Sequence, residues 1–366
     1  MSFHGAVATP IFQSSTYRHA PDADGRYDAV RYSRLSNGPN HVVLHDKLAR
    51  MTGHEAALVC ASGMAAIAGT LLGLVRPGER IFFQRGLYGG TQILHDQDLP
   101  NLGIGCDLAT TDDVAAWRDA IRPGTRAIYV EAIANPLTTV LDLAAVVALA
   151  RDIGALAIID ATFASPVNFR PSELGFDVEV HSATKYLNGH SDVIAGVVAG
   201  REPLVRKVRL TQNHLGGALE PHACFLLERG LKTLTLRVRQ QNATTLGLAR
   251  YLAGHPHVHA VHYPGLDPER LVPSAVRDRF HGYGGVLSFT TEASRARELM
   301  TRLMLATPAP SLGGPETLVT IPATTSHSGV AREARLAMGI EDGLVRVACG
   351  LEALDDIVAD FAQALA

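Results

Sequence analysis

The feature that most constrains the fold of this chain is the alternation of short apolar segments with helix-like segments from about residue 41 onward. Four apolar runs are typical of buried strands: RIFFQ, RAIYVEAI, ALAIIDAT and VEVHSAT. Around and between them lie patterns that predict helices: HVVLHDKLARM, SGMAAIAGTLLGLV, DDVAAWRDAI and LDLAAVVALARDIG. The alternation predicts an α/β fold with a mainly parallel sheet covered on both faces, in which ligands bind at the carboxyl ends of the strands.

Two further regions flank this part of the chain. The first forty or so residues are rich in polar residues, glycine and proline and lack sustained periodicity, so we expect an arm of the kind that often reaches a neighbouring subunit. The segment LERGLKTLTLRVRQQNATTLGLARYLAG predicts one long linking helix. The runs VHAVHYP, GGVLSF and LVRVACG that follow are spaced like the strands of a second, α+β domain, with its boundary near residue 235.

The composition narrows the kinds of partner. The 366 residues are 47% hydrophobic and 19% charged, and a formal net charge of −3 gives no basic surface for nucleic acid or an anionic membrane, so we expect small molecules. We expect neither a signal peptide nor a membrane span, because the most apolar stretch is interrupted by Arg151 and Asp152. The four cysteines, 60, 106, 224 and 349, are far apart in sequence, which fits a reducing cytoplasm better than a zinc site or a disulfide framework.

One lysine stands between two expected strands. It is Lys185 in HSATKYLNGH, which follows the apolar run FDVEV and precedes VIAGVVAG. A buried lysine is costly unless it is paired or neutral, and burial lowers its pKa toward the range in which the amine is a nucleophile. From this decapeptide alone, a lysine that extends from a loop into solvent remains the commoner alternative.

Three other positions after expected strands suggest chemistry, each with an ordinary structural alternative. Ser62-Gly63-Met64 forms a strand-to-helix turn whose N–H groups suit a phosphate, or a simple helix cap. Asp160 ends the apolar strand ALAIID, where a buried carboxylate needs a cationic partner unless it only caps a turn. Tyr88 follows RIFFQ and could stack on a flat ring or fill the edge of the core.

Taken in order, the motifs resemble those of the trans-sulfuration family, the pyridoxal-phosphate enzymes of cysteine and methionine metabolism. The matching segments are SGMAA, LYGGT, the E-x-x-x-NP of Glu131 to Pro136, IIDATF, HSATKYLNGHSDVIAGVV, RGLKTLTLR, SLGGPETLVTIPATTSHS and LVRVACGLE. The resemblance runs from about residue 30 to the last residue. It implies a type I aminotransferase-like fold with three parts: an arm at 1–45, a cofactor-binding domain at 46–235 and a C-terminal domain at 236–366.

The resemblance also implies a role for each matching residue. Lys185 would form a Schiff base with pyridoxal phosphate and later carry a proton. Asp160 would pair with the pyridine nitrogen, so that the ring accepts electrons from the substrate. Tyr88 would stack on the ring and move a proton, and Asn135 would lie near the ring hydroxyl.

The remaining matches concern the phosphate, the substrate and a partner subunit. The phosphate would be held by hydroxyl and backbone N–H groups of Ser62, Gly63, Met64, Ser182 and Thr184. Ser311 and Arg346 would hold the substrate carboxylate, for which a bidentate guanidinium is well suited. Tyr32 and Arg34 would cross to the cofactor phosphate of a neighbouring subunit, which implies a dimer with shared sites built into a tetramer.

Departures from the family pattern bear on the substrate. Gly90 stands where methionine γ-lyases usually have cysteine, and Pro310 stands where many cystathionine-handling members have glutamate. Ala161 and the pair Ala348-Cys349 also replace common residues. We therefore expect elimination or replacement at the β or γ carbon of a sulfur-containing or O-activated amino acid, with a specialised pathway as one setting. An aminotransferase and a non-catalytic cofactor-binding homologue remain the alternatives.

The histidines at 255, 257, 259 and 262 raise a rival hypothesis of a metal site, since alternation on a strand would place the first three on one face. No acid or cysteine lies nearby in sequence, so we favour a solvated or interface strand and expect no metal.

Overall fold

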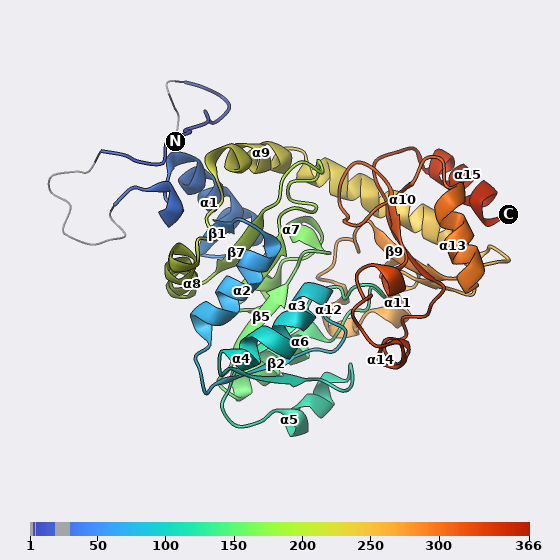
Figure 1. Ribbon diagram of the computed structural model, residues 1–366, viewed down its shortest axis with the longest axis horizontal. Helices are drawn as coiled ribbons and strands as arrows, with labels where there is room; N and C mark the ends of the chain where they lie inside the picture. Colours follow the sequence, from blue (N-terminus) through green and yellow to red (C-terminus); the bar gives the residue numbers. More distant parts are fainter. Residues whose placement is uncertain (1–2, 4, 19–29) are drawn as a thin grey trace.

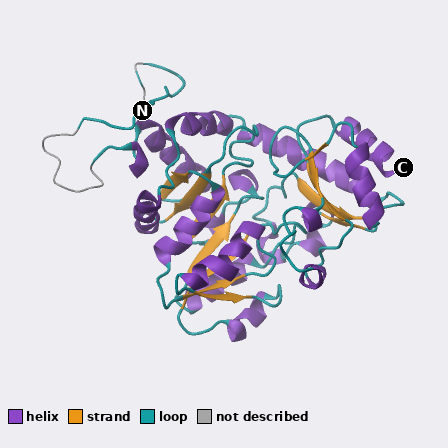
Figure 2. Cartoon of the chain, in the orientation of Figure 1, coloured by secondary structure: helices purple, strands orange, loops and turns teal. Residues whose placement is uncertain are grey.

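The computed structural model describes residues 3, 5–18 and 30–366, and it contains two β-sheets that lie side by side with helices around them (Figure 1). Figure 2 separates the two groups of strands. The larger sheet has seven strands in the order β1-β7-β6-β5-β4-β2-β3. These are β1 Ala56–Cys60, β2 Arg80–Phe83, β3 Gly105–Leu108, β4 Thr125–Glu131, β5 Leu156–Asp160, β6 Val178–Ser182 and β7 Gly196–Gly200.

The larger sheet is mainly parallel, as the alternating pattern predicts. The strands β2 to β6 pair in parallel, and β7 runs antiparallel to both β1 and β6. The parallel strands therefore end at one edge, where Asp160 is the last residue of β5 and Ser182 the last of β6. Polar side chains that follow separate strands in the sequence converge at this edge.

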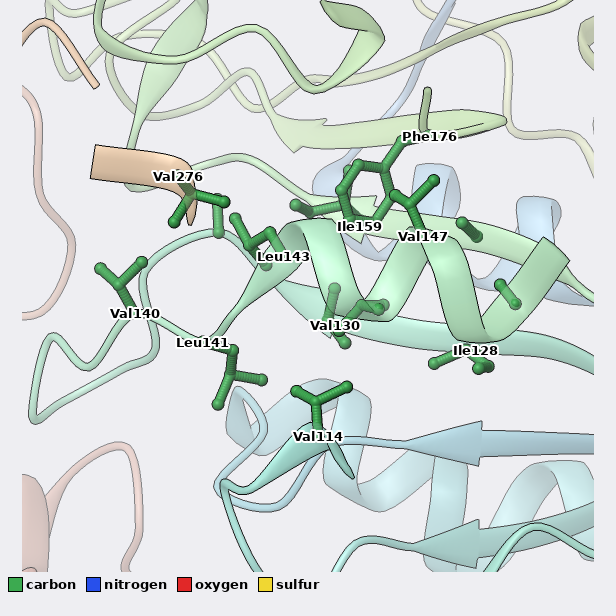
Figure 3. Close-up of a cluster of buried hydrophobic side chains, with 14 of the residues drawn as sticks. Val114, Ile128, Val130, Val140, Leu141, Leu143, Val147, Ile159, Phe176 and Val276 are labelled. Carbon is green, nitrogen blue, oxygen red and sulfur yellow. The ribbon is translucent and has the colours of Figure 1, made fainter. Parts of the chain in front are cut away.

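Helices cover both faces of this sheet because its strands are apolar on both sides. On one face α6 (Leu143–Asp152) packs Leu143 and Val147 against Ile128, Val130 and Ile159 (Figure 3). On the other face two helices, α2 (Gly63–Leu74) and α8 (Glu202–Leu215), pack on Ile158 and Val180. Fully buried apolar strands of this kind are the reason for the continuous apolar runs in the sequence.

The smaller sheet has five strands in the order β10-β11-β12-β9-β8. These are β8 Ala260–His262, β9 Val286–Thr290, β10 Thr307–Pro308, β11 Leu318–Thr320 and β12 Leu344–Ala348. It has its own core, in which Phe289 and Val345 meet Phe361 of α15 (Leu354–Leu365). The helix α10 (Leu234–Ala253) contributes Val238 to a core beside the large sheet and Leu248 to the core of the small sheet.

The shorter helices connect these layers. They are α3 Gly89–Ile93, the π-helical turn Leu94–Asp98, α4 Leu99–Asn101, α5 Trp117–Ala120, α7 Ser165–Asn168, α11 Pro268–Leu271, α12 Ser274–Arg277, α13 Ala293–Arg302 and α14 Arg332–Ala337. Among the described residues, no helix has the length and apolar character needed to cross a membrane.

The prediction of one long linking helix is wrong, because the chain forms two helices there. The first, α9 (Pro221–Leu231), ends before α10 begins at Leu234. Gly230 lies so close to the Asn188 backbone that a Cβ would meet the Asn188 carbonyl oxygen at 2.2 Å. Arg237 of α10 donates to the Gly230 carbonyl at 3.0 Å and to the Tyr186 carbonyl at 2.9 Å. The break therefore lets one buried guanidinium satisfy carbonyls at the end of α9 and in the segment after β6.

Two other expectations for local structure need correction. The segment DDVAAWRDAI forms a 3-10 turn, Val114–Ala116, followed by the short α5, where one helix was expected. The strand β8 begins at Ala260, so the first three histidines of the predicted strand, 255, 257 and 259, precede it. Among the residues that the structure describes, no group of three or more histidine, cysteine, aspartate or glutamate residues is arranged to hold a metal.

The described part of the N-terminal segment packs on two helices. Asn40 of α1 (Pro39–Thr52) donates to the Pro10 carbonyl and accepts from the Phe12 amide, both at 2.9 Å. The Thr9 hydroxyl donates to Glu228 of α9 at 2.9 Å. Residues 9–12 are thus fixed to the body of their own chain, while the assignment of residues 1–45 as an arm to a neighbour stays a prediction.

Candidate active site

A cavity of about 620 Å³ lies at the carboxyl edge of the large sheet, between this sheet and the small one. Eleven of the predicted site residues line it, and they come from segments spread over most of the sequence. They are Ser62, Gly63, Met64, Tyr88, Asn135, Asp160, Ser182, Thr184, Lys185, Ser311 and Arg346. The convergence predicted from the order of the motifs is therefore present in space.

Lys185 follows β6 and is mostly withdrawn from solvent in this cavity. Its Nζ atom donates a hydrogen bond to Ser311 Oγ at 2.7 Å. Burial, with a further contribution from the positive charge of Arg346, lowers the pKa of the Lys185 ammonium to about 8. A substantial fraction of the amine is therefore neutral near physiological pH, which is the form that attacks a carbonyl carbon.

Asp160 is buried at the end of β5. Its Oδ1 atom accepts from the Thr162 amide at 2.9 Å, and the Tyr129 hydroxyl donates to Oδ2 at 3.4 Å. Burial raises the pKa of the carboxyl group. A cationic partner inside the cavity would lower the cost of keeping this charge in the interior.

Glu131 lies beside Asp160 on the neighbouring strand, in register with it. Its carboxylate accepts from the Tyr88 amide at 2.6 Å and from the Asn135 amide at 3.3 Å. Burial and the adjacent Asp160 raise the pKa of Glu131 to about 8. Glu131 belongs to the E-x-x-x-NP motif, for which the resemblance implies no role of this glutamate, and its carboxylate positions the backbone of two predicted site residues.

The residues predicted to bind the phosphate surround the start of α2. The Ser62 hydroxyl oxygen accepts from the Ala65 amide at 3.0 Å, which leaves its proton free to donate. The amides of Gly63 and Met64 belong to the first turn, so they have no partner within the helix. A Cβ on Gly63 would meet Ser182 Cβ at 2.7 Å, so only glycine allows this close approach of helix and strand.

Thr184 differs from the other predicted phosphate ligands because its hydroxyl already has two partners. It accepts from the Ala195 amide at 3.1 Å and lies 3.2 Å from the Ala195 carbonyl, to which it donates. To bind an anion it must turn its proton away from that carbonyl. Ser62 and the helix amides are more directly available.

Arg346 lies on β12 of the small sheet and is fully enclosed. Its Nη1 donates to Asn135 Oδ1 at 3.0 Å and its Nη2 to the Ser311 carbonyl at 3.2 Å, whereas the buried Nε has no hydrogen-bond partner among the described residues. Burial lowers the pKa of the guanidinium to about 10, so it stays charged at neutral pH. A carboxylate in the cavity would supply both the missing acceptor and the counter-charge.

Ser311 connects the two cations. Its backbone has a φ of 97°, in the left-handed region that a serine rarely adopts. In this conformation its hydroxyl accepts from Lys185 and its carbonyl accepts from Arg346. Unfavourable backbone conformations of this kind are retained where the surrounding contacts require them.

Tyr32 and Arg34 do not line the cavity of their own chain. The guanidinium of Arg34 donates to the Asn213 carbonyl at 2.7 Å and lies 5.4 Å from the centre of the Tyr32 ring. Their predicted contact with the cofactor of a neighbouring subunit stays a prediction.

Several lining residues were not predicted as site residues. They are Ile67, Ile133, Thr162, Phe163, Ile194, Leu312, Thr320, Thr325 and Ser326, with Glu131 and Pro310 named earlier for other reasons. Thr162 and Phe163 follow the predicted Asp160 after Ala161, so their proximity was available from the sequence. Thr325 and Ser326 lie in the matching motif SLGGPETLVTIPATTSHS, which assigned them no role, and they reach the cavity through the packing of the small sheet.

Comparison with known proteins identifies the family. The chain matches, over residues 2–366, the model of the family described as Cys/Met metabolism PLP-dependent enzyme. This protein belongs to that family. It is 39% identical over 371 residues to L-methionine gamma-lyase of Pseudomonas putida, which covers 99% of this chain and 93% of the relative. It is 38% identical over 363 residues to cystathionine gamma-lyase of Bacillus subtilis, which covers 99% of this chain and 94% of the relative.

Solved structures agree with the family assignment. Cystathionine gamma-lyase from Lactobacillus plantarum, complexed with L-serine, superposes with a TM-score of 0.92 at 38% identity, covering 98% of this chain and 93% of the other. A Campylobacter jejuni protein solved with N'-pyridoxyl-lysine-5'-monophosphate gives a TM-score of 0.91 at 27% identity, covering 99% and 96%. The expected type I fold and pyridoxal phosphate as the cofactor are therefore confirmed.

The cavity suits this cofactor in its own geometry. A buried carboxylate that needs a cation, an amine of lowered pKa and a helix N-terminus capped by a serine lie on one cavity, at Asp160, Lys185 and Ser62. These groups match the pyridinium, the aldehyde and the phosphate of pyridoxal phosphate.

Proposed function

We propose that this protein catalyses elimination or replacement at the β or γ carbon of a sulfur-containing or O-activated amino acid. The observation that carries the proposal is the pairing of two buried cations in one cavity, Lys185 and Arg346, which are connected through Ser311. A lysine of lowered pKa next to a carboxylate-binding arginine suits proton transfer at the α carbon of a bound amino acid. The relatives named as gamma-lyases support the same reaction class.

The cofactor, when bound, supplies a conjugated ring that accepts electrons from the substrate. Asp160 would hold the ring nitrogen in its protonated state, because a buried carboxylate is stabilised by an adjacent cation. The turn at Ser62 and the Ser182 hydroxyl would fix the phosphate. These residues would together hold the cofactor in the cavity.

The chain's own residues would then handle the substrate. Arg346 would bind the α-carboxylate through Nε and one terminal nitrogen, with Asn135 already fixing Nη1. Lys185 Nζ would remove and return protons at carbon atoms of the bound amino acid. Tyr88, whose backbone amide donates to Glu131 and whose side chain is exposed, would move a proton near the leaving group.

An aminotransferase is the alternative within the same fold, and a non-catalytic cofactor-binding homologue is a second. The second is disfavoured because Lys185, Asp160 and Arg346 all line one cavity. Product analysis with methionine, homocysteine, cystathionine and O-acylated homoserines distinguishes the reactions. Ammonia with a 2-oxo acid indicates elimination, a new amino acid indicates replacement, and dependence on an added oxo acid would instead indicate transamination.

The working unit in this proposal is a homodimer with shared sites, assembled into a tetramer. Its support is Arg34, a cation in an N-terminal segment outside the cavity of its own chain. Arg34→Ala and Lys185→Ala damage different subunits of such a site, so mixed and refolded variants should regain activity in part. If subunits exchange and no activity returns, while Arg34→Ala alone is fully active, the shared site is contradicted.

Domain limits and location complete the proposal. The division into residues 46–235 and 236–366 is supported by the two separate sheets and by the small sheet's own core, and α10 joins the two parts. A cytoplasmic location is supported by the four cysteines, 60, 106, 224 and 349, which are all free thiols.

A further inference from the structure

Three buried ionisable side chains, which we call the Glu179 cluster, have no part in the proposed function. Glu179 and His181 belong to β6, and His54 lies between α1 and β1. The side chains of Glu179, His181 and His54 are 0%, 1% and 5% exposed, and none of them lines the cavity. At this exposure a neighbouring subunit cannot contact them, so their charges must be balanced within one chain.

The carboxylate of Glu179 is the centre of the cluster. Its Oε1 atom lies 2.9 Å from Nε2 of His181, and its Oε2 atom lies 3.3 Å from Nε2 of His54. Burial acts to raise the pKa of the Glu179 carboxyl, but the hydrogen bonds and charges of the two histidines outweigh it, so the pKa is lowered. Glu179 is therefore ionised at neutral pH, and a carboxylate buried in this way needs at least one imidazole in its protonated form.

The Glu179 cluster joins two strands that are not neighbours in the sheet. Glu179 of β6 pairs with Ala199 of β7, which pairs with Ala57 of β1, so these three side chains lie in one row on the same face. The two alanine side chains are short, which leaves the imidazole of His54 room to reach Glu179 across β7. The backbone of His54 is fixed as well, since its amide donates to the Ala49 carbonyl of α1 at 3.0 Å.

The same two strands carry both halves of the predicted phosphate site. Three residues further along each strand, Cys60 of β1 and Ser182 of β6 both pair with Gly196 of β7. Ser182 is itself a predicted phosphate ligand, and Cys60 precedes the turn at Ser62 by two residues. Because β1 and β6 run in the same direction, the cluster and the phosphate site lie about 10 Å apart along the same pair of strands.

Close packing at the phosphate site leaves little freedom in the spacing of β1 and β6. A Cβ on Gly196 would meet the Ser62 carbonyl oxygen at 2.1 Å, and a Cβ on Gly63 would meet Ser182 Cβ at 2.7 Å. The turn at Ser62 therefore lies directly against β7 and against Ser182 of β6. A change in the distance between β1 and β6 would move this turn relative to Ser182.

We infer that the Glu179 cluster holds β1 and β6 at the spacing that lets the Ser62 turn and Ser182 bind one phosphate group. The inference rests on the place of the cofactor phosphate in the proposed function. Without the Glu179 charge, the two buried imidazoles would lose their counter-charge, and the contact between β1 and β6 would weaken. The members of the cluster are positioning residues, because they act on the phosphate through the two strands.

Binding of pyridoxal phosphate and of pyridoxal to the apoprotein tests the inference without turnover. We define the phosphate preference as the dissociation constant of pyridoxal divided by that of pyridoxal phosphate. In Glu179→Gln, affinity for pyridoxal phosphate should fall about tenfold and affinity for pyridoxal less than about threefold, so the phosphate preference falls. The phosphorus NMR resonance of bound pyridoxal phosphate should also move. An unchanged phosphate preference in folded Glu179→Gln would overturn the inference.

His54→Ala gives a second test that does not depend on the folding of Glu179→Gln. His181 still faces Glu179 in this variant, so the phosphate preference should fall less, by at least about twofold. The double variant should match Glu179→Gln alone, because His54 acts through the carboxylate. An unchanged phosphate preference in His54→Ala, or effects of the two substitutions that multiply, would overturn the role of His54.

Two further variants separate the possible results. Asp360 is a buried carboxylate of α15 that accepts from the amides of Met304 and Leu305 and does not line the cavity, so Asp360→Asn is the matched control. An equal fall of the phosphate preference in this control would overturn the inference. Ser182→Ala removes a predicted phosphate ligand and should lower the phosphate preference. If Ser182→Ala lowers it and Glu179→Gln does not, the inference fails and the phosphate site stands. If neither does, both are wrong.

Discussion

Two buried charges, Asp160 on the large sheet and Arg346 on the small sheet, face one cavity but are satisfied differently. Both oxygens of Asp160 accept hydrogen bonds from the protein, whereas Arg346 has a buried Nε with no partner among the described residues. Burial disfavours the charged form in both cases, raising the pKa of one and lowering that of the other. The hydrogen-bonded carboxylate of Asp160 suits a cofactor that stays bound. The Arg346 guanidinium, whose Nε has no partner among the described residues, suits a substrate that binds and leaves.

The largest expected effect comes from removing the charge on the cofactor side. In Asp160→Ala the ring nitrogen would lose its counter-charge, so kcat should fall by about 10³-fold or more. Asp152→Ala, which removes an exposed carboxylate paired with Arg118 on the surface, is the control and should keep normal activity. Steady-state kinetics at saturating cofactor measures kcat of both variants. Normal turnover by Asp160→Ala would refute the role of Asp160.

The next largest effect is expected from removing the Arg346 guanidinium, which would bind the substrate carboxylate. Arg346→Leu should lower kcat/KM for every amino-acid substrate, because the carboxylate loses a desolvated charge pair. The loss should correspond to about 2–5 kcal/mol of transition-state stabilisation. The cofactor absorption spectrum should be retained, and Arg118→Leu on the surface should match the wild type. Loss of cofactor together with normal substrate affinity would mean that the two roles are reversed.

The sequence predicts part of the fold and part of the candidate site. The strand pattern predicts the parallel sheet, and the motifs predict eleven residues that line one cavity. Residues that follow parallel strands meet there because the carboxyl ends of these strands share one edge of the sheet. The break between α9 and α10 escaped prediction because it depends on Gly230 packing on a distant backbone and on Arg237. Thr325 and Ser326 lie in a matching motif, but their place in the cavity is set by tertiary packing of the small sheet.

A smaller effect is expected from adding a methyl group at Gly63, where the start of α2 packs against Ser182. In Gly63→Ala the new methyl group would meet Ser182 Cβ at 2.7 Å and its Cα at 2.9 Å, so helix and strand must separate. Affinity for pyridoxal phosphate should fall about tenfold, since the separation displaces the amides of the first helical turn. Gly329→Ala adds a methyl group where no atom lies within 4 Å, and it serves as the control. Equal cofactor affinity in the two variants would contradict this position for the phosphate.

The smallest effect is expected in the pH dependence of cofactor attachment to Lys185, which the charge of Arg346 influences. Attachment of the cofactor to the apoprotein needs neutral Lys185, whose pKa is lowered to about 8, so its rate should rise with pH and level off above that value. Because the charge of Arg346 contributes to the lowering, Arg346→Leu should move the midpoint to higher pH and slow attachment at neutral pH. Stopped-flow absorbance measures the midpoint, and a shift to lower pH would contradict the coupling.

The central claim, that Lys185 is the residue to which the cofactor is attached, can be tested by chemical trapping. The chain has four lysines, Lys47, Lys185, Lys207 and Lys232, so the number of alternative sites is small. The holoenzyme is reduced with borohydride and digested, and its peptides are sequenced by mass spectrometry. We expect a stable pyridoxyl-phosphate adduct on Lys185 at close to one per subunit. An adduct on Lys47, Lys207 or Lys232, or no adduct on a holoenzyme that is active, would contradict it.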